Sequence, residues 1–156
     1  MKKITLTELV DNMEMQNDLT YFLYHKKSGE ILYFSDEEMS IAESAEDEYL
    51  PEWQVQSVKI AEDTLNNSND YIEIPSQFDI HEYRIMEQFC LGLPIEKCEI
   101  LENTIRGRGA FRRFKDKIYD LGVAEQWFAF KQNYFYGIAK DWCEKHKIDY
   151  FDDRKK

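Results

Sequence analysis

The sequence predicts an α+β protein, and three observations predict this class. Two β-favouring runs joined by a glycine-containing loop lie near the N-terminus, a third run ends at Pro75, and the later segments have apolar residues at helical spacing. Strands gathered early and helices late are typical of α+β proteins and not of alternating α/β proteins. We expect a small antiparallel sheet, an N-terminal hairpin plus one short strand, packed with about six helices, and an all-helical C-terminal half.

The length and composition predict one folded domain. The chain has 156 residues, of which 43% are hydrophobic and 15% aromatic, enough to build a core and to exclude intrinsic disorder as the main state. Within the expected single domain 1–156 we distinguish a mixed hairpin and helix part (1–75), a helical part (76–150) and a tail (151–156).

Local signals define the first elements. A threonine-capped helix is expected over the apolar positions Leu6, Leu9, Val10 and Met13. Residues 19–25 and 31–34 favour β-strands, and the loop 26–29 contains a glycine, so the two runs predict a hairpin. Ser35 followed by Glu38 is a capping box and predicts a helix directly after the hairpin.

Further signals define the elements that follow. Pro51 suits the start of a helix that ends at the polar cluster 66–70, and the run 71–75 reads as an edge strand or strand end because proline follows it. Asp79 and Glu82 form a second capping box. The expected apolar faces of the next three helices are Tyr83, Met86, Cys90 and Leu93; then Cys98, Leu101 and Ile105; then Phe111, Phe114, Ile118 and Leu121.

The last helix is expected over residues 123–146. Its stripe of Trp127, Tyr134, Ile138 and Trp142, with Phe128, Phe135 and Ala139 beside it, is interpreted as core. An interior glycine is unfavourable in a helix, so Gly137 indicates close packing or a kink.

Composition excludes several classes of protein. No apolar run is long enough to span a membrane and the N-terminus has no signal peptide, so we expect a cytoplasmic protein without a membrane partner. The formal net charge of −11 argues against general DNA binding. Three cysteines, Cys90, Cys98 and Cys143, are interpreted as buried thiols and not as a disulfide framework.

The charge is distributed unevenly along the chain. Residues 1–105 carry 7 basic and 23 acidic side chains, whereas residues 106–117 carry 6 basic and 1 acidic, a local net charge of +5. Two of these cations fall in the first turn of a predicted helix, where they oppose the helix dipole. This cationic segment is therefore the place where an anion is most expected.

We predict an anion-binding site in the Gly-Arg loop. It is formed by Arg106, Gly107, Arg108, Gly109, Arg112 and Arg113. Glycine lets the backbone approach a ligand, the N–H groups at a helix start bind phosphate or carboxylate, and arginine adds bidentate contacts. The alternative is that the cations pair with carboxylates of the same chain, and ion-pair networks of this kind are common in proteins.

Catalytic patterns are scarce, which favours a protein that is not an enzyme. Gly107-x-Gly109 lacks the third glycine of a dinucleotide fingerprint, and the run 108–111 matches an RNA-recognition motif only loosely. Cys143 and His146 share a helical face but are better explained as a buried thiol and a helix-terminal histidine. No metal site or cofactor is predicted.

The chain resembles Uncharacterised Protein Family 0158, a group of bacterial proteins. The resemblance is carried by residues 106–116, by Glu125-x-Trp127-x-x-Phe130 and Ala139-x-x-Trp142, and upstream by Tyr71-Ile72-x-Ile74-Pro75 with Tyr83, Met86 and Phe89. An N-terminal hairpin with glycine at its turn also fits this family. The resemblance implies relatives but no activity.

Three functions remain open. The first is a binding or regulatory module whose Gly-Arg loop meets an anionic ligand or protein partner. The second is an enzyme acting on a phosphorylated small molecule held by Arg108, Arg112 and Arg113. The third is an immunity- or inhibitor-like protein that neutralises a basic partner through the acidic stretch 36–52, which carries eight carboxylates and no basic residue.

Overall fold

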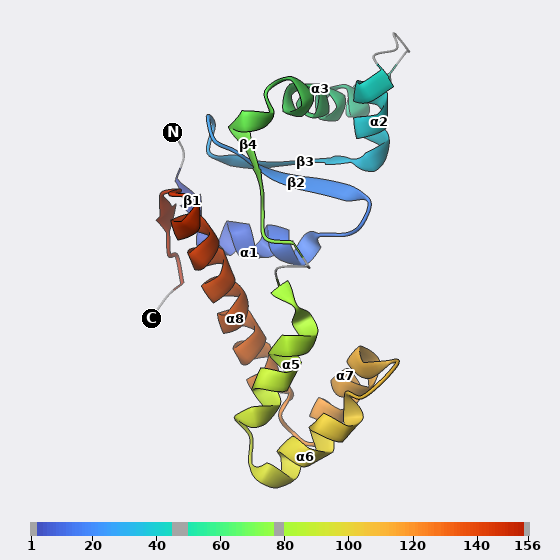
Figure 1. The fold of residues 1–156 in the computed structure, drawn as a ribbon, viewed down its shortest axis with the longest axis vertical. Coiled ribbons are helices and arrows are strands. Elements are labelled where there is room, and N and C mark those ends of the chain that lie inside the picture. The colour runs from blue at the N-terminus through green and yellow to red at the C-terminus, as the bar shows by residue number, and fades with distance from the viewer. Residues whose placement is uncertain (1–2, 45–49, 77–79, 155–156) are drawn as a thin grey trace. The chain divides into compact units, whose positions relative to one another are not determined.

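The computed structural model describes residues 3–44, 50–76 and 80–154. It confirms the α+β class: the described residues form seven α-helices, a three-stranded antiparallel sheet and a two-stranded parallel pair (Figure 1). The chain divides into two compact units, one made of residues 1–76 and 139–156 and the other of residues 77–138.

The first unit contains the sheet and the helices around it. Its elements are β1 (Ile4–Thr5), α1 (Leu6–Met15), β2 (Thr20–His25), β3 (Glu30–Ser35), α2 (Asp36–Ser44), α3 (Glu52–Asn66), the 3-10 turn η1 (Ser68–Asp70), β4 (Tyr71–Glu73) and β5 (Tyr150–Phe151). Strand β2 is central, with β3 and β4 antiparallel on either side, so the predicted hairpin and the edge position of the third strand are both confirmed.

Both faces of the sheet are covered, because three successive residues of β2, Phe22, Leu23 and Tyr24, are buried. Leu23 belongs to a cluster with Phe34 of β3 and with buried residues of α2 and α3, which lie on one face of the sheet (Figure 1). Adjacent side chains of a strand point to opposite faces, so Tyr24 is directed to the other face.

Two of the predicted helix caps are present. The Thr5 hydroxyl accepts a hydrogen bond from the Glu8 N–H over 3.1 Å. Ser35 accepts from the Glu38 N–H over 3.1 Å while the Glu38 carboxylate accepts from the Ser35 N–H over 2.8 Å, which is the reciprocal capping box. Glycine at the hairpin turn adopts a left-handed conformation, with φ of 75° at Gly29.

The two ends of the first unit pair with each other, which the sequence did not indicate. Ile4 and Thr5 of β1 pair in parallel with Tyr150 and Phe151 of β5. Thr7 adds hydrogen bonds of 3.0 Å and 2.9 Å from its N–H and its hydroxyl to the Asp153 carboxylate. The second residue of β5 is the first of the expected tail, so the described part of the C-terminal half contains a short strand besides its helices.

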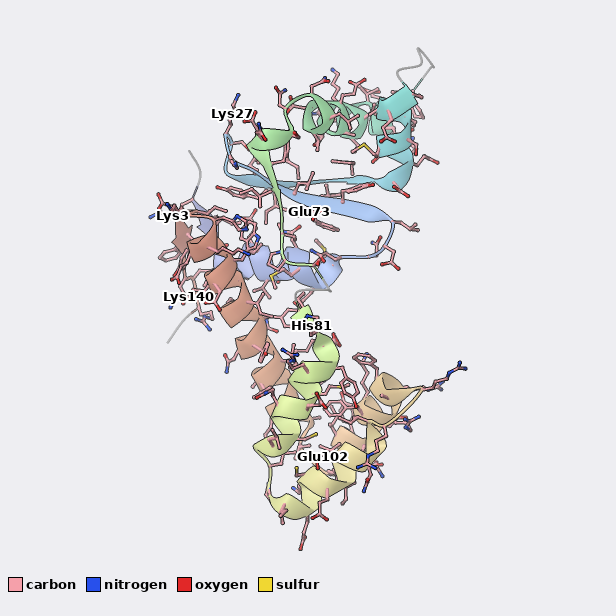
Figure 2. The ribbon with its side chains drawn as sticks, in the orientation of Figure 1. Lys3, Lys27, Glu73, His81, Glu102 and Lys140 are labelled. Carbon is pink, nitrogen blue, oxygen red and sulfur yellow. The ribbon has the colours of Figure 1, made fainter. Side chains whose placement is uncertain are left out.

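The second unit is helical. It contains α5 (Glu82–Leu91), α6 (Ile95–Thr104), α7 (Ala110–Asp120) and the first part of α8 (Ala124–Lys145), which crosses the division between the units. Its core is aromatic: Phe114 lies 4.7 Å from Trp127, and Phe89 lies 5.4 Å from Trp127 and 5.5 Å from Phe130, as ring-centroid distances. Figure 2 shows rings filling the space beside α5 and α7.

The start and the buried face of α5 differ from the prediction. Asp79, the predicted cap, lies outside the described residues; α5 begins at Glu82 after His81, which has φ of 50° and makes no side-chain cap hydrogen bond. The buried residues are Ile85, Met86, Phe89 and Cys90. Tyr83 is 40% exposed, and its hydroxyl donates to the Ile105 carbonyl over 3.0 Å.

Two other predicted core residues are exposed. In α7 the buried stripe is Ala110, Phe114 and Ile118, so Phe111 lies one residue off it and is 45% exposed. In α8, Trp127, Phe135, Ala139 and Trp142 are buried as predicted, whereas Phe128 is 51% exposed. Gly137 is not closely packed, since a Cβ built there meets nothing within 4 Å.

Two of the three cysteines are fully buried, as predicted, and Cys98 is half-buried; all three are free thiols. Burial raises the pKa of Cys90 to about 11 and that of Cys143 to about 12. In the part of the chain that the structure describes, the search for a helix both long and apolar enough to cross a membrane finds none.

Candidate functional site

The Gly-Arg loop connects α6 to α7 in the second unit. Helix α6 ends at Thr104, with Ile105 as its C-cap, and α7 begins at Ala110. Gly107 and Gly109 have φ of 76° and 74°, a left-handed conformation that glycine adopts without steric cost. The two glycines therefore make the tight turn between the helices possible.

Gly109 is the N-cap of α7 and supplies no side-chain hydrogen bond to the helix. The first N–H groups of a helix have no acceptor within the helix. The N-terminus of α7 therefore has N–H groups that an anion can accept from, and its first turn contains no acidic residue.

Arg113, itself exposed, holds the loop together through hydrogen bonds to its backbone. Its Nε donates to the Thr104 carbonyl over 2.9 Å, and its two terminal nitrogens donate to the carbonyls of Arg106 and Arg108. These carbonyls lie at the end of α6 and in the loop itself, so one guanidinium closes the connection. Arg113 is thus a structural residue of the predicted site, bound to backbone oxygens and not to a carboxylate.

The other cations of the segment are on the surface. Arg106, Arg108, Arg112 and Lys115 are exposed, and Lys117 is half-buried. The salt bridges among the described residues are Lys27–Asp70, Lys131–Glu82 and Arg154–Asp152, and none of them includes a cation of residues 106–117. In Figure 2, side chains tipped with nitrogen extend outward from the connection between α6 and α7.

An aromatic ring accompanies these cations. Phe111, next to Arg112 on the first turn of α7, leaves 45% of its surface exposed. It lies one residue after Ala110, off the buried stripe of Ala110, Phe114 and Ile118. The surface around the Gly-Arg loop therefore presents positive charge, N–H donors and one ring.

The described part of the acidic stretch has roles within the first unit. Glu38 is buried and caps α2, Glu37 accepts a hydrogen bond from Gln54 over 2.9 Å, and Asp36 accepts one from Tyr21 over 3.2 Å. Three carboxylates in the first turn of α2 also favour the helix dipole. The middle of the stretch, Glu46, Asp47 and Glu48, lies outside the described residues.

The thiol of Cys143 in α8 and the imidazole of His146 just after it do not form a reactive pair. Cys143 is fully buried, and burial raises its pKa to about 12, whereas a nucleophilic thiol needs a lowered pKa. The ring of His146 lies 5.1 Å from that of Trp142. Among the described residues there is no group of three or more histidine, cysteine, aspartate or glutamate side chains placed to hold a metal ion.

The residues that carry the family resemblance fall into two groups in the structure. Trp127 and Phe130 pack in the aromatic core of the second unit, and the Trp142 indole N–H donates to the Glu73 carbonyl over 3.1 Å at the end of β4. Residues 106–113 instead form the surface loop described above and the first turn of α7. The first group explains packing, and the second remains the candidate site.

The fold and the loop define a small α+β protein with an exposed Gly-Arg connection between two helices. The model of the uncharacterised protein family UPF0158 matches residues 1–155, so the chain belongs to this family. Comparison with the curated proteins gives no significant match, and comparison with the solved structures gives none either.

Proposed function

We propose that this protein is a binding or regulatory module whose Gly-Arg loop engages an anionic group of its ligand or partner. One observation supports this most: four exposed cations, Arg106, Arg108, Arg112 and Lys115, lie together without a carboxylate partner among the described residues. The chain as a whole has a net charge of −11, so acidic side chains were available for pairing.

The loop is also held ready for a ligand. Arg113 ties the carbonyls of residues 104, 106 and 108 together, so ordering the loop costs little when the ligand binds. The guanidinium groups of Arg108 and Arg112 offer bidentate contacts, and the N-terminus of α7 adds N–H donors. Phe111 gives a surface on which a base can stack, which favours a nucleotide or single-stranded RNA over a simple anion.

The test is a thermal unfolding titration of the full chain at low salt with pyrophosphate, a short single-stranded RNA and polyglutamate. A ligand present at about 100 times its Kd stabilises the folded state by about 2.7 kcal/mol, so a rise in Tm is expected with at least one of them. Adding salt lowers the effect, because these cations are solvent-exposed.

Two double variants locate the binding. Arg108→Ala with Arg112→Ala removes two exposed guanidinium groups and leaves the Arg108 carbonyl bonded to Arg113, so the variant should keep the wild-type Tm and lose the effect of the RNA and of polyglutamate. Lys59→Ala with Lys140→Ala changes the net charge equally at exposed positions outside the loop and should retain it. A flat response of the wild type to all three ligands, or an undiminished response of the arginine variant, would overturn the proposal.

A further inference from the structure

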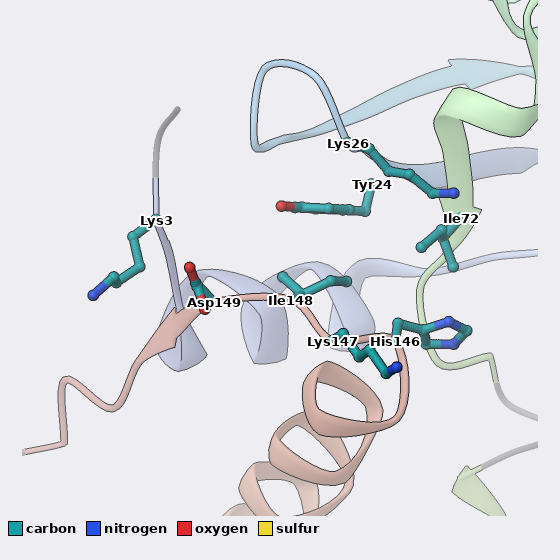
Figure 3. Close-up of a pocket in the computed structure, with 8 residues that line it drawn as sticks. All are labelled: Lys3, Tyr24, Lys26, Ile72, His146, Lys147, Ile148 and Asp149. Carbon is teal, nitrogen blue, oxygen red and sulfur yellow. The ribbon is translucent and has the colours of Figure 1, made fainter.

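The first unit contains a pocket of about 440 Å³, far in sequence from the Gly-Arg loop. It lies between the end of β2, strand β4 and the segment that follows α8 (Figure 3). Small-molecule sites in proteins commonly have volumes of about 300–1,000 Å³. The pocket is therefore large enough for a small ligand, and its lining decides which kind.

Tyr24 forms the centre of the lining. The residue is only 3% exposed, and its ring is held edge-on against Trp142 at a centroid distance of 6.0 Å. Its hydroxyl has no hydrogen-bond partner among the described residues. Every fully buried polar side-chain atom of these residues has a partner, so the Tyr24 oxygen is not fully buried and is open to the pocket. A tyrosine hydroxyl can both donate and accept a hydrogen bond, so this accessible oxygen is a ready contact for a ligand.

The hydroxyl is also in the right state to donate. Burial raises the pKa of Tyr24 above its ordinary value, with smaller contributions from Cys143 and Asp149. The tyrosine therefore stays protonated at neutral pH. Asp149 itself lines the pocket, so a ligand group beside Tyr24 meets one donor and one carboxylate.

The pocket is rich in positive charge. Lys3, Lys26 and Lys147 line it together with His146, and Asp149 is the acidic residue among the described residues of the lining. None of these lysines takes part in a salt bridge within the described parts of the chain, whereas the neighbouring Lys27 is paired with Asp70 at 3.4 Å. Figure 3 places Lys26, His146 and Lys147 toward the Ile72 side of the Tyr24 ring, and Lys3 and Asp149 on the side of its hydroxyl.

Helix termination alone does not explain the lysine at position 147. The Lys147 N–H donates to the Glu144 carbonyl over 3.2 Å and the Ile148 N–H to the Cys143 carbonyl over 2.8 Å, the two bonds of a Schellman motif. Position 147 is the left-handed residue of this motif, with φ of 57°, where glycine is the usual residue. A side chain kept at such a position indicates a role for the side chain.

We propose that this pocket binds a small molecule that carries a phosphate or carboxylate group. Lys26 and Lys147 hold the anionic group, the Tyr24 ring with Ile72 and Ile148 contacts the body of the molecule, and the Tyr24 hydroxyl bonds a polar group at its other end. The backbone that carries these side chains is held in place, because Tyr24 of β2 pairs with Ile72 of β4 and the Lys26 N–H donates to the Asp70 carbonyl over 2.8 Å.

The experiment is an NMR titration of the full chain, following backbone amide signals at constant ionic strength. Inorganic pyrophosphate is the phosphate probe and citrate the carboxylate probe. Saturable shifts of the amides of residues 26, 72, 147 and 148 with either probe are the expected result, and the probe that gives the lower Kd identifies the anionic group. Shifts confined to residues 106–112 would overturn this inference and leave the proposed function of the Gly-Arg loop standing.

Three variants decide whether the pocket residues act as described. Lys147→Gly relieves the left-handed strain, so it should unfold at the same or a higher temperature while the Kd rises about tenfold or more, the cost of one lost charged contact. Tyr24→Phe keeps the ring and should weaken binding by a smaller factor. Lys145→Ala removes an exposed charge of α8 that does not line the pocket and should leave the Kd unchanged. An unaltered Kd in Lys147→Gly would overturn the proposal.

Discussion

Arg113 donates a hydrogen bond from Nε to the carbonyl of Thr104 over 2.9 Å, across nine positions of the chain. With the bonds to the carbonyls of Arg106 and Arg108, it satisfies one backbone acceptor at the end of α6 and two in the loop. Arg113 therefore shapes the Gly-Arg loop, while its neighbours Arg108 and Arg112 remain available for a ligand.

Arg113→Ala should lower the free energy of unfolding by about 1–2 kcal/mol, because backbone carbonyls lose a charged donor at a partly solvated site. Arg113→Lys should recover little of this, since an ammonium group cannot span three carbonyls as the planar guanidinium does. Urea denaturation followed by circular dichroism measures the change. Arg112→Ala is the matched control and should stay within about 0.5 kcal/mol of wild type; equal losses in both variants would contradict the structural role of Arg113.

Gly109→Ala and Gly137→Ala should change stability in opposite directions. At Gly109 the φ of 74° disfavours any side chain, and a Cβ would lie 3.1 Å from a terminal nitrogen of Arg113, so a loss of about 1–2 kcal/mol is expected. At Gly137, inside α8, a Cβ meets nothing within 4 Å, and alanine should add up to about 1 kcal/mol. Thermal unfolding of the two variants beside wild type measures both; a destabilised Gly137→Ala would show a packing constraint at that position.

The elements that the sequence predicted correctly depend on short-range chemistry. The Ser35–Glu38 capping box and the hairpin closed by Gly29 each depend on residues within a few positions of one another. The α+β class follows from the same local signals. The family resemblance over residues 106–116 was confirmed by the match to residues 1–155.

The features that could not be predicted depend on contacts between distant residues. The acceptors of Arg113 and the pairing of β1 with β5 have no local signature, and the pocket around Tyr24 joins the N-terminus, the hairpin, β4 and the end of α8. The error at Phe111 has another cause. Phe114 and Ile118 fit a buried helix face that starts at Ala110 and also one that starts at Phe111. The sequence favoured Phe111 because phenylalanine is more hydrophobic than alanine, but Ala110 is the buried residue.

Phe114→Ala should cost about 3–5 kcal/mol of unfolding free energy, the range for a fully buried phenylalanine. Phe114 is 1% exposed and contacts the rings of Phe89 and Trp127. Phe111→Ala should change stability by less than about 1 kcal/mol, because the ring is 45% exposed, and should weaken ligand binding to the Gly-Arg loop if a base stacks on it. Guanidinium chloride denaturation measures the unfolding free energy of both variants. Similar losses of free energy would show that Phe111 is a core residue.

Tyr71→Phe should flatten the pH dependence of stability at both extremes. Burial and the 2.5 Å hydrogen bond to Asp63 raise the pKa of Tyr71 from 10.0 to about 12, and the same hydrogen bond lowers the pKa of Asp63 below 3.8. A raised tyrosine pKa stabilises the folded state below pH 10 and the stabilisation is lost as pH rises toward about 12, while the lowered aspartate pKa gives stabilisation that is lost as pH falls below 3.8.

Urea denaturation at successive pH values should show the wild-type advantage over Tyr71→Phe shrinking in both windows. Cys90 and Cys143 also lose stabilisation in alkali but are common to both proteins, so they cancel in the difference. Tyr119→Phe, at an exposed position, is the control and should keep the wild-type pH profile; a constant difference between wild type and Tyr71→Phe at every pH would show that the hydroxyl pair does not titrate with folding.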